Sequence, residues 1–426
     1  MLSRKNNMTK VAVIGLGYIG LPTSIILAKN GFDVLGVDIS SEVIETLKLG
    51  KAHIVEPGLE KSLSQVISSG SLQVNTAISP ADIFIIAVPT PLKADNSPDL
   101  SYIESACEQI IPHLSSGNLV ILESTSPIGT TEKISKLIAK SRKDLVLPHS
   151  NKEEATINVA YCPERVLPGN ILNELVQNDR IIGGISELCS KRATIMYEKF
   201  IEGQCLSTDA ASAEMVKLSE NAFRDVNIAF ANELSMIAGS QNVDVWELIR
   251  LANRHPRVNI LNPGPGVGGH CIAVDPWFLV DSDKKNSNLL RTARAVNDYK
   301  PQFILNQVKN ALANIAEPIV ACLGLAFKAN IDDLRESPSL DICRTLASDK
   351  SLKINIVEPN IDNIPDIFSE NKNVALTDIK TALEHANLIL LLVDHDQFHS
   401  IPQKHNLDGK VIIDTRGIWN NHRHPN

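Results

Sequence analysis

Residues 10–38 read KVAVIGLGYIGLPTSIILAKNGFDVLGVD, in which a short apolar strand leads through the glycine-rich turn GLGYIG into an apolar helix. Glycines with the spacing GxGxxG permit a tight turn and let a pyrophosphate approach the N-terminus of the helix. The next strand ends at Asp38, whose carboxylate can accept hydrogen bonds from an adenosine ribose and would repel a 2′-phosphate. The stretch therefore predicts an NAD-binding βαβ unit, and the alternative is a tight turn without a ligand. The cofactor-binding residues expected in the turn are Gly15, Gly17, Tyr18, Ile19 and Gly20.

Strand and helix patterns alternate at both ends of the chain. Short apolar strands are expected at residues 10–15, 32–38, 83–88 and 119–123, with a helix at 21–30, and further strands at 319–323, 353–357, 388–393 and 410–414. This spacing is typical of parallel, doubly wound sheets. Residues 209–253 repeat apolar side chains every three or four positions, which predicts one long helix or two joined helices. The expected fold is α/β, with two Rossmann-like doubly wound domains joined by a long helical connector and domain boundaries at 1–205, 206–305 and 306–426.

Composition and charge exclude several classes of protein. The 426 residues are 43% hydrophobic and 21% charged, and the net charge is −8 without a basic block, so no nucleic-acid partner is expected. No apolar run reaches the roughly 18 residues of a membrane span. The seven cysteines are scattered without a CxxC pair, which favours reduced thiols and a cytoplasmic protein. His395 and His399 lack carboxylate or thiol partners at ligand spacing, so no metal site is expected.

The loop GPGVGGHCIAVDP, residues 264–276, places a thiol after a run of glycines and a carboxylate four residues after the thiol. If a helix begins near Cys271, the thiolate lies at its positive end, where the pKa of a thiol falls. Asp275 would then lie one turn further on the same face. A nicotinamide cofactor together with an activated cysteine indicates an oxidation that continues past the aldehyde, because a thiol can hold the aldehyde as a thiohemiacetal and then as a thioester.

Further loops carry polar residues where predicted strands end. Pro89 and Thr90 follow one strand and Thr125 follows another, so these residues are placed to line the cofactor cleft. The loop YCPERVLPG combines Glu164, which could transfer a proton, with Arg165, which could bind an anionic or polar substrate group. The alternatives are ordinary turn chemistry for Pro89, Thr90 and Thr125 and a surface ion pair for the other loop.

Lys217 and Asn221 lie four residues apart in the long helical segment, so both project from one face of the helix. A lysine beside an asparagine could stabilise a developing alkoxide. The charged neighbours Glu214, Glu220 and Arg224 favour the alternative that this face is a solvated stripe.

Eight motifs, in this order, resemble those of the UDP-glucose/GDP-mannose dehydrogenase family, the nucleotide-sugar 6-dehydrogenases. They are GLGYIGLP, PTP, STSPIGTT, CPERVLPG, AEMVKLSENAFRDVNIAFANE, PGPGVGGHCIAVDP, GLAFKANIDDLRESPS and IIDTRG, and together they span nearly the whole chain. CPERVLPG with RHPRVNIL resembles the UDP-N-acetyl-D-mannosamine dehydrogenase branch. The UDP-glucose and GDP-mannose branches usually carry phenylalanine where this chain has Arg165.

The resemblance implies that UDP-N-acetyl-D-mannosamine is oxidised at its C6 alcohol to UDP-N-acetyl-D-mannosaminuronate. Such a four-electron oxidation would use two NAD in succession. Cys271 would be the covalent nucleophile, and Lys217 and Asn221 would stabilise the oxyanions of the alkoxide and the thiohemiacetal. The product would serve the synthesis of a surface polysaccharide.

The other implied residues serve hydrolysis, binding and assembly. Asp275 would help to activate water, Thr125 would position that water, and Glu164 would take part in proton transfer or thioester hydrolysis. Arg335 would lie near the cofactor. Arg257 would reach into the site of a neighbouring subunit, which makes the enzyme a homodimer or higher homo-oligomer built on the connector helix. The implied substrate-binding residues are Glu164, Arg165, Val166, Lys217, Asn221, Arg257, Gly264, Gly268, Lys328 and Arg416.

Two other classes of protein share part of this pattern. A 3-hydroxyacid or phosphogluconate-type dehydrogenase also joins a Rossmann domain to helices with a catalytic lysine, but it needs no cysteine and lacks a second C-terminal α/β domain. A non-catalytic nucleotide-sugar-binding protein would be expected to have lost Cys271, Lys217 or Asp275, and all three are present. The sugar is left open among N-acetylmannosamine, N-acetylglucosamine, N-acetylgalactosamine and glucose, because no spacing rule reads a single stereocentre.

Overall fold

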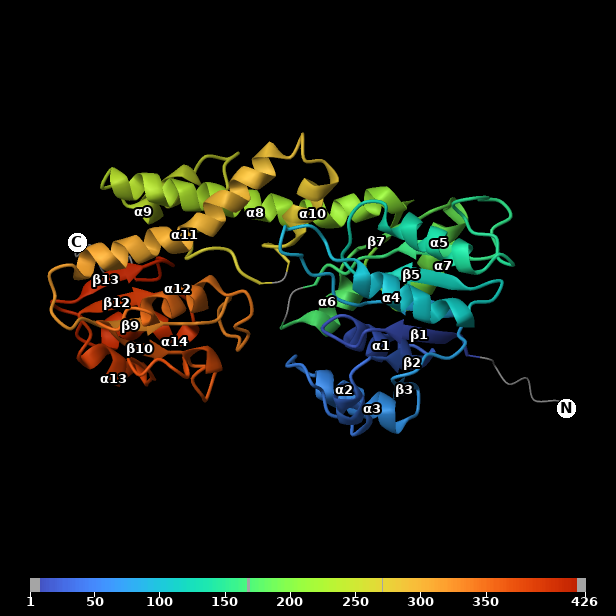
Figure 1. Cartoon of the computed structure of the whole chain (residues 1–426), viewed down its shortest axis with the longest axis horizontal. Coiled ribbons are helices and arrows are strands. Elements are labelled where there is room, and N and C mark those ends of the chain that lie inside the picture. The colour runs from blue at the N-terminus through green and yellow to red at the C-terminus, as the bar shows by residue number, and fades with distance from the viewer. Residues whose placement is uncertain (1–7, 167–168, 270, 420–426) are drawn as a thin grey trace. The chain divides into compact units, whose positions relative to one another are not determined.

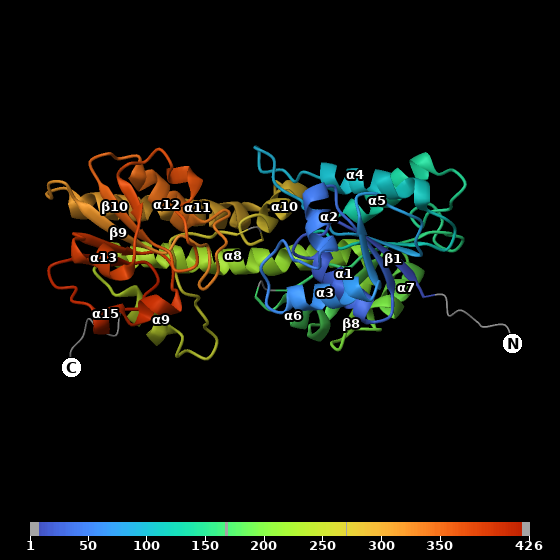
Figure 2. The same cartoon turned by 90° about the horizontal axis from the view of Figure 1, so that it is seen from below.

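The computed structural model describes residues 8–166, 169–269 and 271–419, and the chain divides into two compact units, Met1–Glu220 and Asn221–Asn426. The boundary falls within α8 (Ala210–Ser240), a continuous helix of 31 residues that Figures 1 and 2 show as one unbroken ribbon. A second helix, α9 (Val245–Ala252), follows it. The helical segment predicted at 209–253 is therefore two joined helices.

The first unit is built on an eight-stranded sheet with the order β3-β2-β1-β4-β5-β6-β7-β8. All neighbouring strands are parallel except β6 and β7, which are antiparallel. After β3 the chain returns to the other side of β1 and continues with β4, which makes the carboxyl end between β1 and β4 a switch point of the kind at which doubly wound sheets bind ligands. The strands are β1 (Lys10–Ile14), β2 (Asp33–Val37), β3 (Leu72–Asn75), β4 (Ile83–Ile86), β5 (Leu119–Leu122), β6 (Asn158–Tyr161), β7 (Arg180–Gly184) and β8 (Cys205–Asp209).

Apolar side chains cover both faces of this sheet, because successive residues of a strand point to opposite faces. Val11 and Val13 of β1 belong to one core cluster, and Ala12 and Ile14 belong to the other. The helices of the first unit are α1 (Gly20–Lys29), α2 (Ser41–Lys48), α3 (Leu59–Ser68), α4 (Ser101–Ile110), α5 (Thr130–Ser141), α6 (Ile171–Gln177), α7 (Glu187–Tyr197) and a 3-10 turn at Ile111–His113.

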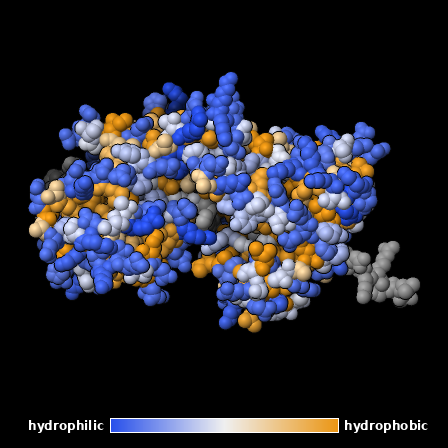
Figure 3. All heavy atoms as spheres, in the orientation of Figure 1, coloured by the Kyte–Doolittle hydropathy of each residue, from blue (hydrophilic) through white to orange (hydrophobic). Residues whose placement is uncertain are grey.

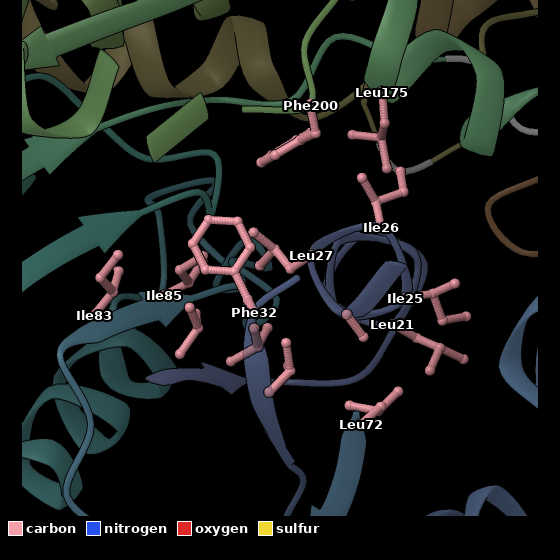
Figure 4. Close-up of a cluster of buried hydrophobic side chains, with 14 of the residues drawn as sticks. Leu21, Ile25, Ile26, Leu27, Phe32, Leu72, Ile83, Ile85, Leu175 and Phe200 are labelled. Atoms are coloured by element: carbon pink, nitrogen blue, oxygen red, sulfur yellow. The ribbon is translucent and has the colours of Figure 1, made fainter. Parts of the chain in front are cut away.

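Helix α1 is buried almost all round, which explains why its sequence GLPTSIILAK is apolar without a polar stripe. In Figure 4, Ile26 points toward Leu175 of α6. Leu27 lies beside Phe32 on another side of the same helix. This packing fixes the helix whose N-terminus follows the glycine-rich turn.

The second unit contains a five-stranded, wholly parallel sheet with the order β11-β10-β9-β12-β13. Its strand order also reverses at the first strand, so it is a second doubly wound sheet. The predicted α/β fold with two Rossmann-like domains is confirmed. The strands are β9 (Ile319–Leu323), β10 (Lys353–Val357), β11 (Val374–Leu376), β12 (Leu388–Leu391) and β13 (Val411–Asp414). The helices are α10 (Asp275–Ser282), α11 (Asn288–Leu312), α12 (Pro338–Ala347), α13 (Ile379–Glu384), α14 (Asp396–His399), α15 (Ile401–Lys404) and a 3-10 turn at Asp366–Phe368.

A buried polar network joins α8 to α11. The Arg294 guanidinium pairs with Asp225 at 2.7 Å and also with Asp298, and Asn297 Nδ2 donates to Asp225 Oδ1 at 2.8 Å. Such a network aligns the two helices, because a slip by one turn would leave a buried charge without its partner.

On the face drawn in Figure 3, polar and apolar side chains are interspersed, and neither kind forms a large patch. Within the described residues, no helix has both the length and the apolar character needed to cross a membrane.

Candidate active site

The glycine-rich turn lies between the end of β1 and the start of α1, and its three glycines meet different surroundings. Gly15 adopts φ +92°, and a Cβ there would lie 2.6 Å from the Ala87 carbonyl oxygen. A Cβ on Gly20 would overlap the Gly15 carbonyl. A Cβ on Gly17 would have no atom within 4 Å. Gly15 and Gly20 are therefore required by the turn itself, whereas Gly17 faces open space where a pyrophosphate can approach the backbone.

Asp38 and Thr90 are two polar residues predicted to bind the cofactor. The Asp38 carboxylate accepts hydrogen bonds from the backbone N–H groups of Leu16 and Ser40, both at 3.0 Å, so it is fixed beside the glycine-rich turn. The hydroxyl of Thr90 is buried and has no hydrogen-bond partner among the described residues. A buried hydroxyl without a partner is costly unless a ligand supplies one, so these residues fit the cofactor predicted from the sequence.

The loop after β5 carries Thr125, which is half-buried, and leads into α5. The fully buried carboxylate of Glu214 on α8 accepts from the N–H groups of Gly129 at 2.6 Å and Thr131 at 2.8 Å, and from the Thr131 hydroxyl at 2.6 Å. Burial raises the pKa of Glu214, and these hydrogen bonds oppose the rise. Glu214 thus stabilises the positive end of α5 and holds the Thr125 loop to α8.

The loop after β6 is also held to α8. Arg165 forms a two-pronged ion pair with Glu220, with Nη2–Oε1 at 2.6 Å and Nε–Oε2 at 3.1 Å. The Glu164 carboxylate accepts from the backbone N–H of Val166 at 2.9 Å. Glu164, Arg165 and Val166 are all half-buried, and the next residues, 167 and 168, lie outside the described part of the chain. The surface ion pair suggested by the sequence is therefore a pair between this loop and α8, not one within the loop.

A buried ionic cluster that sequence reasoning missed lies beneath this loop. Arg180 of β7 pairs with Glu123, which follows β5, at 2.5 Å, and the Tyr197 hydroxyl donates to the same carboxylate at 2.6 Å. Arg180 also donates to the Cys162 carbonyl and lies over the Tyr197 ring, 4.6 Å from its centre. The Thr23 hydroxyl of α1 donates to Glu123 at 3.3 Å. The cluster therefore ties the cofactor helix to the strands that carry Thr125 and Glu164.

Lys217 and Asn221 are buried, with 5% and 8% of their surface exposed, so the solvated stripe favoured by the sequence is wrong for them and for Glu214. The burial of a lysine and an amide on one helical face requires polar partners. Asn221 Nδ2 donates to Asp275 Oδ2 at 2.6 Å, and Asp275 is itself buried. Two of the residues predicted to be catalytic, 54 positions apart, are therefore in direct contact.

The loop that carries Cys271 is attached to α8 near both ends. At one end the Gly264 N–H donates to Asn232 Oδ1 at 2.9 Å, and at the other end Asn221 holds Asp275. Cys271 itself is exposed. Its carbonyl accepts from the Asp275 N–H at 2.9 Å, so the two residues are one hydrogen-bonded turn apart.

The helix predicted to begin near Cys271 begins four residues later, because α10 starts at Asp275. Pro276 occupies its first turn, a position that proline favours because no N–H is needed there. Cys271 lies in the turn before the helix. His270, its neighbour in sequence, lies outside the described residues.

The glycines of this loop allow close packing within the second unit. A Cβ on Gly264 would lie 2.7 Å from Arg416 Nη1, and a Cβ on Gly268 would overlap the Glu336 carbonyl. Arg416 is oriented by an ion pair with Asp394 at 2.8 Å. The structure thus brings Arg416 to the start of the Cys271 loop.

Three of the predicted cations are exposed in the second unit. Lys328 lies in the loop after β9, and Arg257 lies in the loop after α9. Arg335 forms a two-pronged pair with Asp333, with Nε–Oδ1 at 2.9 Å and Nη2–Oδ2 at 2.7 Å. Among the described residues, no group of three or more His, Cys, Asp or Glu side chains is arranged to hold a metal ion.

Comparison with known proteins assigns the family. Three domains described for the UDP-glucose/GDP-mannose dehydrogenase family match in succession: the NAD binding domain at residues 9–201, the central domain at 211–299 and the UDP binding domain at 321–421. The chain belongs to this family. It is therefore an NAD-dependent nucleotide-sugar dehydrogenase, as the motifs predicted.

The relatives within the family are named for different sugars. The chain is 54% identical to an NDP-N-acetyl-D-galactosaminuronic acid dehydrogenase of Ralstonia nicotianae, over 96% of both chains. It is 52% identical to a UDP-N-acetyl-D-mannosamine dehydrogenase of Campylobacter jejuni, over 92% of this chain and 97% of that one. Among solved structures, it resembles a UDP-D-ManNAc dehydrogenase of Pyrococcus horikoshii with a TM-score of 0.85 and 41% identity, covering 96% of both chains.

Because the family binds NAD, the open space beside Gly17 leads to a prediction about cofactor binding. We expect Gly17→Ala to raise the KM for NAD about tenfold or more, because the added methyl group occupies the approach of the pyrophosphate. The thermal midpoint should stay within a degree or two, since the methyl meets no protein atom. Steady-state kinetics and calorimetry measure the two effects. Gly239→Ala, whose methyl is equally free, is the matched control, and an unchanged KM in Gly17→Ala would contradict the prediction.

Proposed function

We propose that this enzyme oxidises the C6 alcohol of UDP-N-acetyl-D-mannosamine to the carboxylate of UDP-N-acetyl-D-mannosaminuronate through a thiohemiacetal and a thioester on Cys271. The observation that carries the proposal is the arrangement around the thiol. Cys271 is exposed at the end of a glycine-rich loop, and its carbonyl is hydrogen-bonded to the Asp275 N–H. The Asp275 carboxylate is in turn oriented by Asn221. A thiol, a carboxylate and an amide are thus held together by one loop and one helix.

The four-electron chemistry assigns a distinct task to each group. NAD, held by the glycine-rich turn at Gly17 and by Asp38, would supply the hydride acceptor for each of the two oxidations. Lys217 and Asn221 stabilise the alkoxide as the alcohol becomes an aldehyde. The Cys271 thiolate then adds to the aldehyde carbon, and loss of the second hydride from this thiohemiacetal leaves a thioester.

Hydrolysis of the thioester completes the reaction. Water positioned by Thr125 attacks the thioester carbon while Asp275 and Glu164 accept its protons, and the C–S bond breaks to release the carboxylate and the thiolate. The net change consumes one alcohol, one water and two NAD+, and forms one carboxylate, two NADH and three protons. Because the aldehyde stays bonded to Cys271 while the cofactor exchanges, it does not escape.

The sugar is proposed from the loop that carries Glu164. Arg165 stands where the UDP-glucose and GDP-mannose branches usually carry phenylalanine, and it anchors this loop to Glu220. The Campylobacter jejuni and Pyrococcus horikoshii relatives named for N-acetylmannosamine support the proposal. UDP-N-acetylgalactosamine is the second candidate, which the Ralstonia nicotianae relative favours.

A homodimer or higher homo-oligomer built on α8 is part of the proposal. Four apolar residues of α8 are exposed at a constant spacing of seven positions, namely Val216, Phe223, Phe230 and Ile237. A seven-residue repeat keeps a helix on one face against a partner helix, so this stripe suits a second copy of the same chain. Arg257, exposed after α9, would then reach the partner's site. Analytical ultracentrifugation tests this assembly, and a monomer at every concentration would contradict it.

We also propose a cytoplasmic location. None of the seven cysteines, all of which lie in the described residues, is in a disulfide, which suits a reducing compartment. Fractionation of cells that express the enzyme tests the location, and recovery from an extracytoplasmic fraction would contradict it.

The decisive assay measures NADH formed per sugar by the purified enzyme. We expect two NADH per molecule of UDP-N-acetylmannosamine, and little activity with UDP-glucose or GDP-mannose. UDP-N-acetylglucosamine and UDP-N-acetylgalactosamine are also tested. If one of these gives two NADH per molecule instead, the proposed mechanism stands but the proposed sugar is wrong. One NADH per sugar would refute the thioester pathway.

A further inference from the structure

The loop of residues 325–330 follows β9, the central strand of the five-stranded sheet, and carries the exposed Lys328. Strands β10 and β12 flank β9 on its two sides. Glu358 follows β10 and His395 follows β12, so both residues lie at the carboxyl edge of the sheet next to this loop. Glu358 has 3% of its surface exposed and His395 has 1%. Neither residue was assigned a role from the sequence.

Glu358 holds the beginning of the loop. Its Oε2 atom accepts from the backbone N–H groups of Leu325 at 2.7 Å and Ala326 at 3.1 Å. Its Oε1 atom accepts from the backbone and the side chain of Asn360. Burial alone would raise the pKa of Glu358, but the hydrogen bonds from His395 and Leu325 outweigh burial and lower it. The buried group is therefore a carboxylate, and each of its oxygens accepts hydrogen bonds from both backbone and side-chain donors.

His395 holds the end of the loop. Its Nδ1 atom accepts from the Asn330 N–H at 2.9 Å, which requires that Nδ1 carry no proton. Nε2 then carries the proton and donates to Glu358 Oε2 at 3.0 Å. Asn330 adopts φ +61°, a left-handed conformation that a non-glycine residue keeps only where its surroundings hold it. Its Oδ1 atom accepts from the Asp396 N–H, the residue after His395.

Glu358 and His395 are thus hydrogen-bonded to each other and to the two ends of the six-residue loop 325–330. Each flanking strand contributes one residue, and the bond between them fixes the imidazole in the tautomer that the Asn330 N–H requires. Lys328 lies between the two held ends of the loop and is exposed, whereas both members of the pair are buried. The pair is hydrogen-bonded to the backbone of the loop, so it acts on Lys328 through that backbone.

We propose that Glu358 and His395 are positioning residues that hold the loop 325–330 in the conformation in which Lys328 binds the diphosphate of a UDP-sugar. This inference rests on the proposed UDP-sugar function and on the substrate contact that the family resemblance implies for Lys328. It agrees with the family's UDP binding domain, which covers residues 321–421. A loop held at both ends binds an anion without first losing the freedom of its backbone, so the pair raises affinity without touching the ligand.

The test is the dissociation constant for UDP, measured by calorimetry on the full-length enzyme, together with that for NAD. His395→Phe keeps a ring against Phe398 but removes the hydrogen bonds that His395 makes with Asn330, Asn360 and Glu358. We expect UDP binding to weaken about tenfold with NAD binding unchanged. His395→Asn places an amide oxygen near the former Nδ1, where it can accept from Asn330, and should restore most of the affinity. In turnover, His395→Phe should raise the KM for the UDP-sugar and leave kcat within about threefold. His385→Phe, at an exposed histidine of the same sheet domain, is the matched control.

The outcomes separate this inference from the proposed function. If wild-type enzyme binds UDP and His395→Phe binds it equally well, the positioning role is wrong while the function stands. If His395→Phe weakens UDP and NAD binding alike, or if His395→Asn restores nothing, a general folding role replaces the proposal. If His395→Phe does not fold, His395→Gln replaces it in the test. The glutamine amide can still donate to Glu358 but leaves the Asn330 backbone N–H without its acceptor, so this variant must also weaken UDP binding. Wild-type enzyme that binds no UDP would refute the UDP-sugar function itself.

Discussion

Replacing Cys271 with serine is expected to lower the rate of acid formation by about three orders of magnitude or more. A serine hydroxyl at this position has the size of the thiol but is hardly ionised near neutral pH, so it cannot trap the aldehyde effectively. The thiohemiacetal, which undergoes the second oxidation, is then not formed. The measurement is NADH produced per minute with saturating UDP-sugar, with chromatography of the nucleotide-sugar acid. The same variant should still bind UDP and NAD, because Cys271 is exposed.

The matched control is Cys205→Ser. Cys205 is half-buried on the edge strand β8, and we expect its replacement to leave the rate within about twofold. Acid formation by Cys271→Ser at a tenth of the wild-type rate would contradict a covalent role. In that case a hydrated aldehyde released and rebound by the enzyme would be the alternative route.

The largest effect on stability is expected from Arg180→Met. Arg180 and Glu123 have 5% and 0% of their side chains exposed, so the variant leaves a buried carboxylate without its cation. Breaking a buried pair in this way costs about 3–5 kcal/mol of the free energy of unfolding. Urea denaturation monitored by circular dichroism measures the loss. Arg250→Met, which removes an exposed pair with Glu247, is the control and should cost about 0.5 kcal/mol or less.

The pH dependence of the stability of Arg180→Met provides a second test. Burial already raises the pKa of Glu123, and the charge of Arg180 opposes that rise. Without Arg180 the folded state keeps a proton that the unfolded state releases. The stability of the variant should therefore fall as the pH rises above about 4.3, the ordinary pKa of an unfolded glutamate. A loss of stability below 1 kcal/mol at neutral pH would show that the cluster tolerates an unpaired carboxylate.

Helix α8 organises the functional loops, because its buried polar residues each hold a different one. Glu214 holds the loop of Thr125, Glu220 holds the loop of Glu164, Asn221 holds Asp275, and Asn232 holds the start of the Cys271 loop. These residues follow one another along α8, so the helix contacts each loop at a different point of its length. The same helix carries Lys217, which its burial keeps away from bulk solvent.

Some features were predictable because neighbouring residues create them. The tight turn at Gly15 requires a positive φ, and the spacing of the three glycines predicts both the turn and the helix that follows. The strands at 319–323 and 353–357 have the predicted bounds, because continuous apolar runs are typical of strands buried on both faces. The strands at 83–88 and 388–393 end two residues earlier than predicted, since an apolar run does not mark where pairing stops.

Other elements were missed because their sequences lack a strong local pattern. Strand β8 reads CLSTD and lies at the edge of the sheet, where exposed polar residues are tolerated, and β11 has only three residues. The late start of α10 did have a local signal, since proline at residue 276 favours the first turn of a helix.

The dinucleotide fold, the preference for NAD and the family could all be predicted from the sequence, because each depends on motifs of a few adjacent residues. The separation of Cys271 and Asp275 by one turn could be predicted as well, although that turn precedes α10 instead of lying within it. Only the tertiary structure decided that Asn221 grips Asp275, that Arg180 neutralises Glu123, and that His395 has Glu358 as its partner. These partners are separated by 54, 57 and 37 positions. In each pair, the fold brings together strands or helices that are distant in sequence, and burial requires each polar group to have a partner.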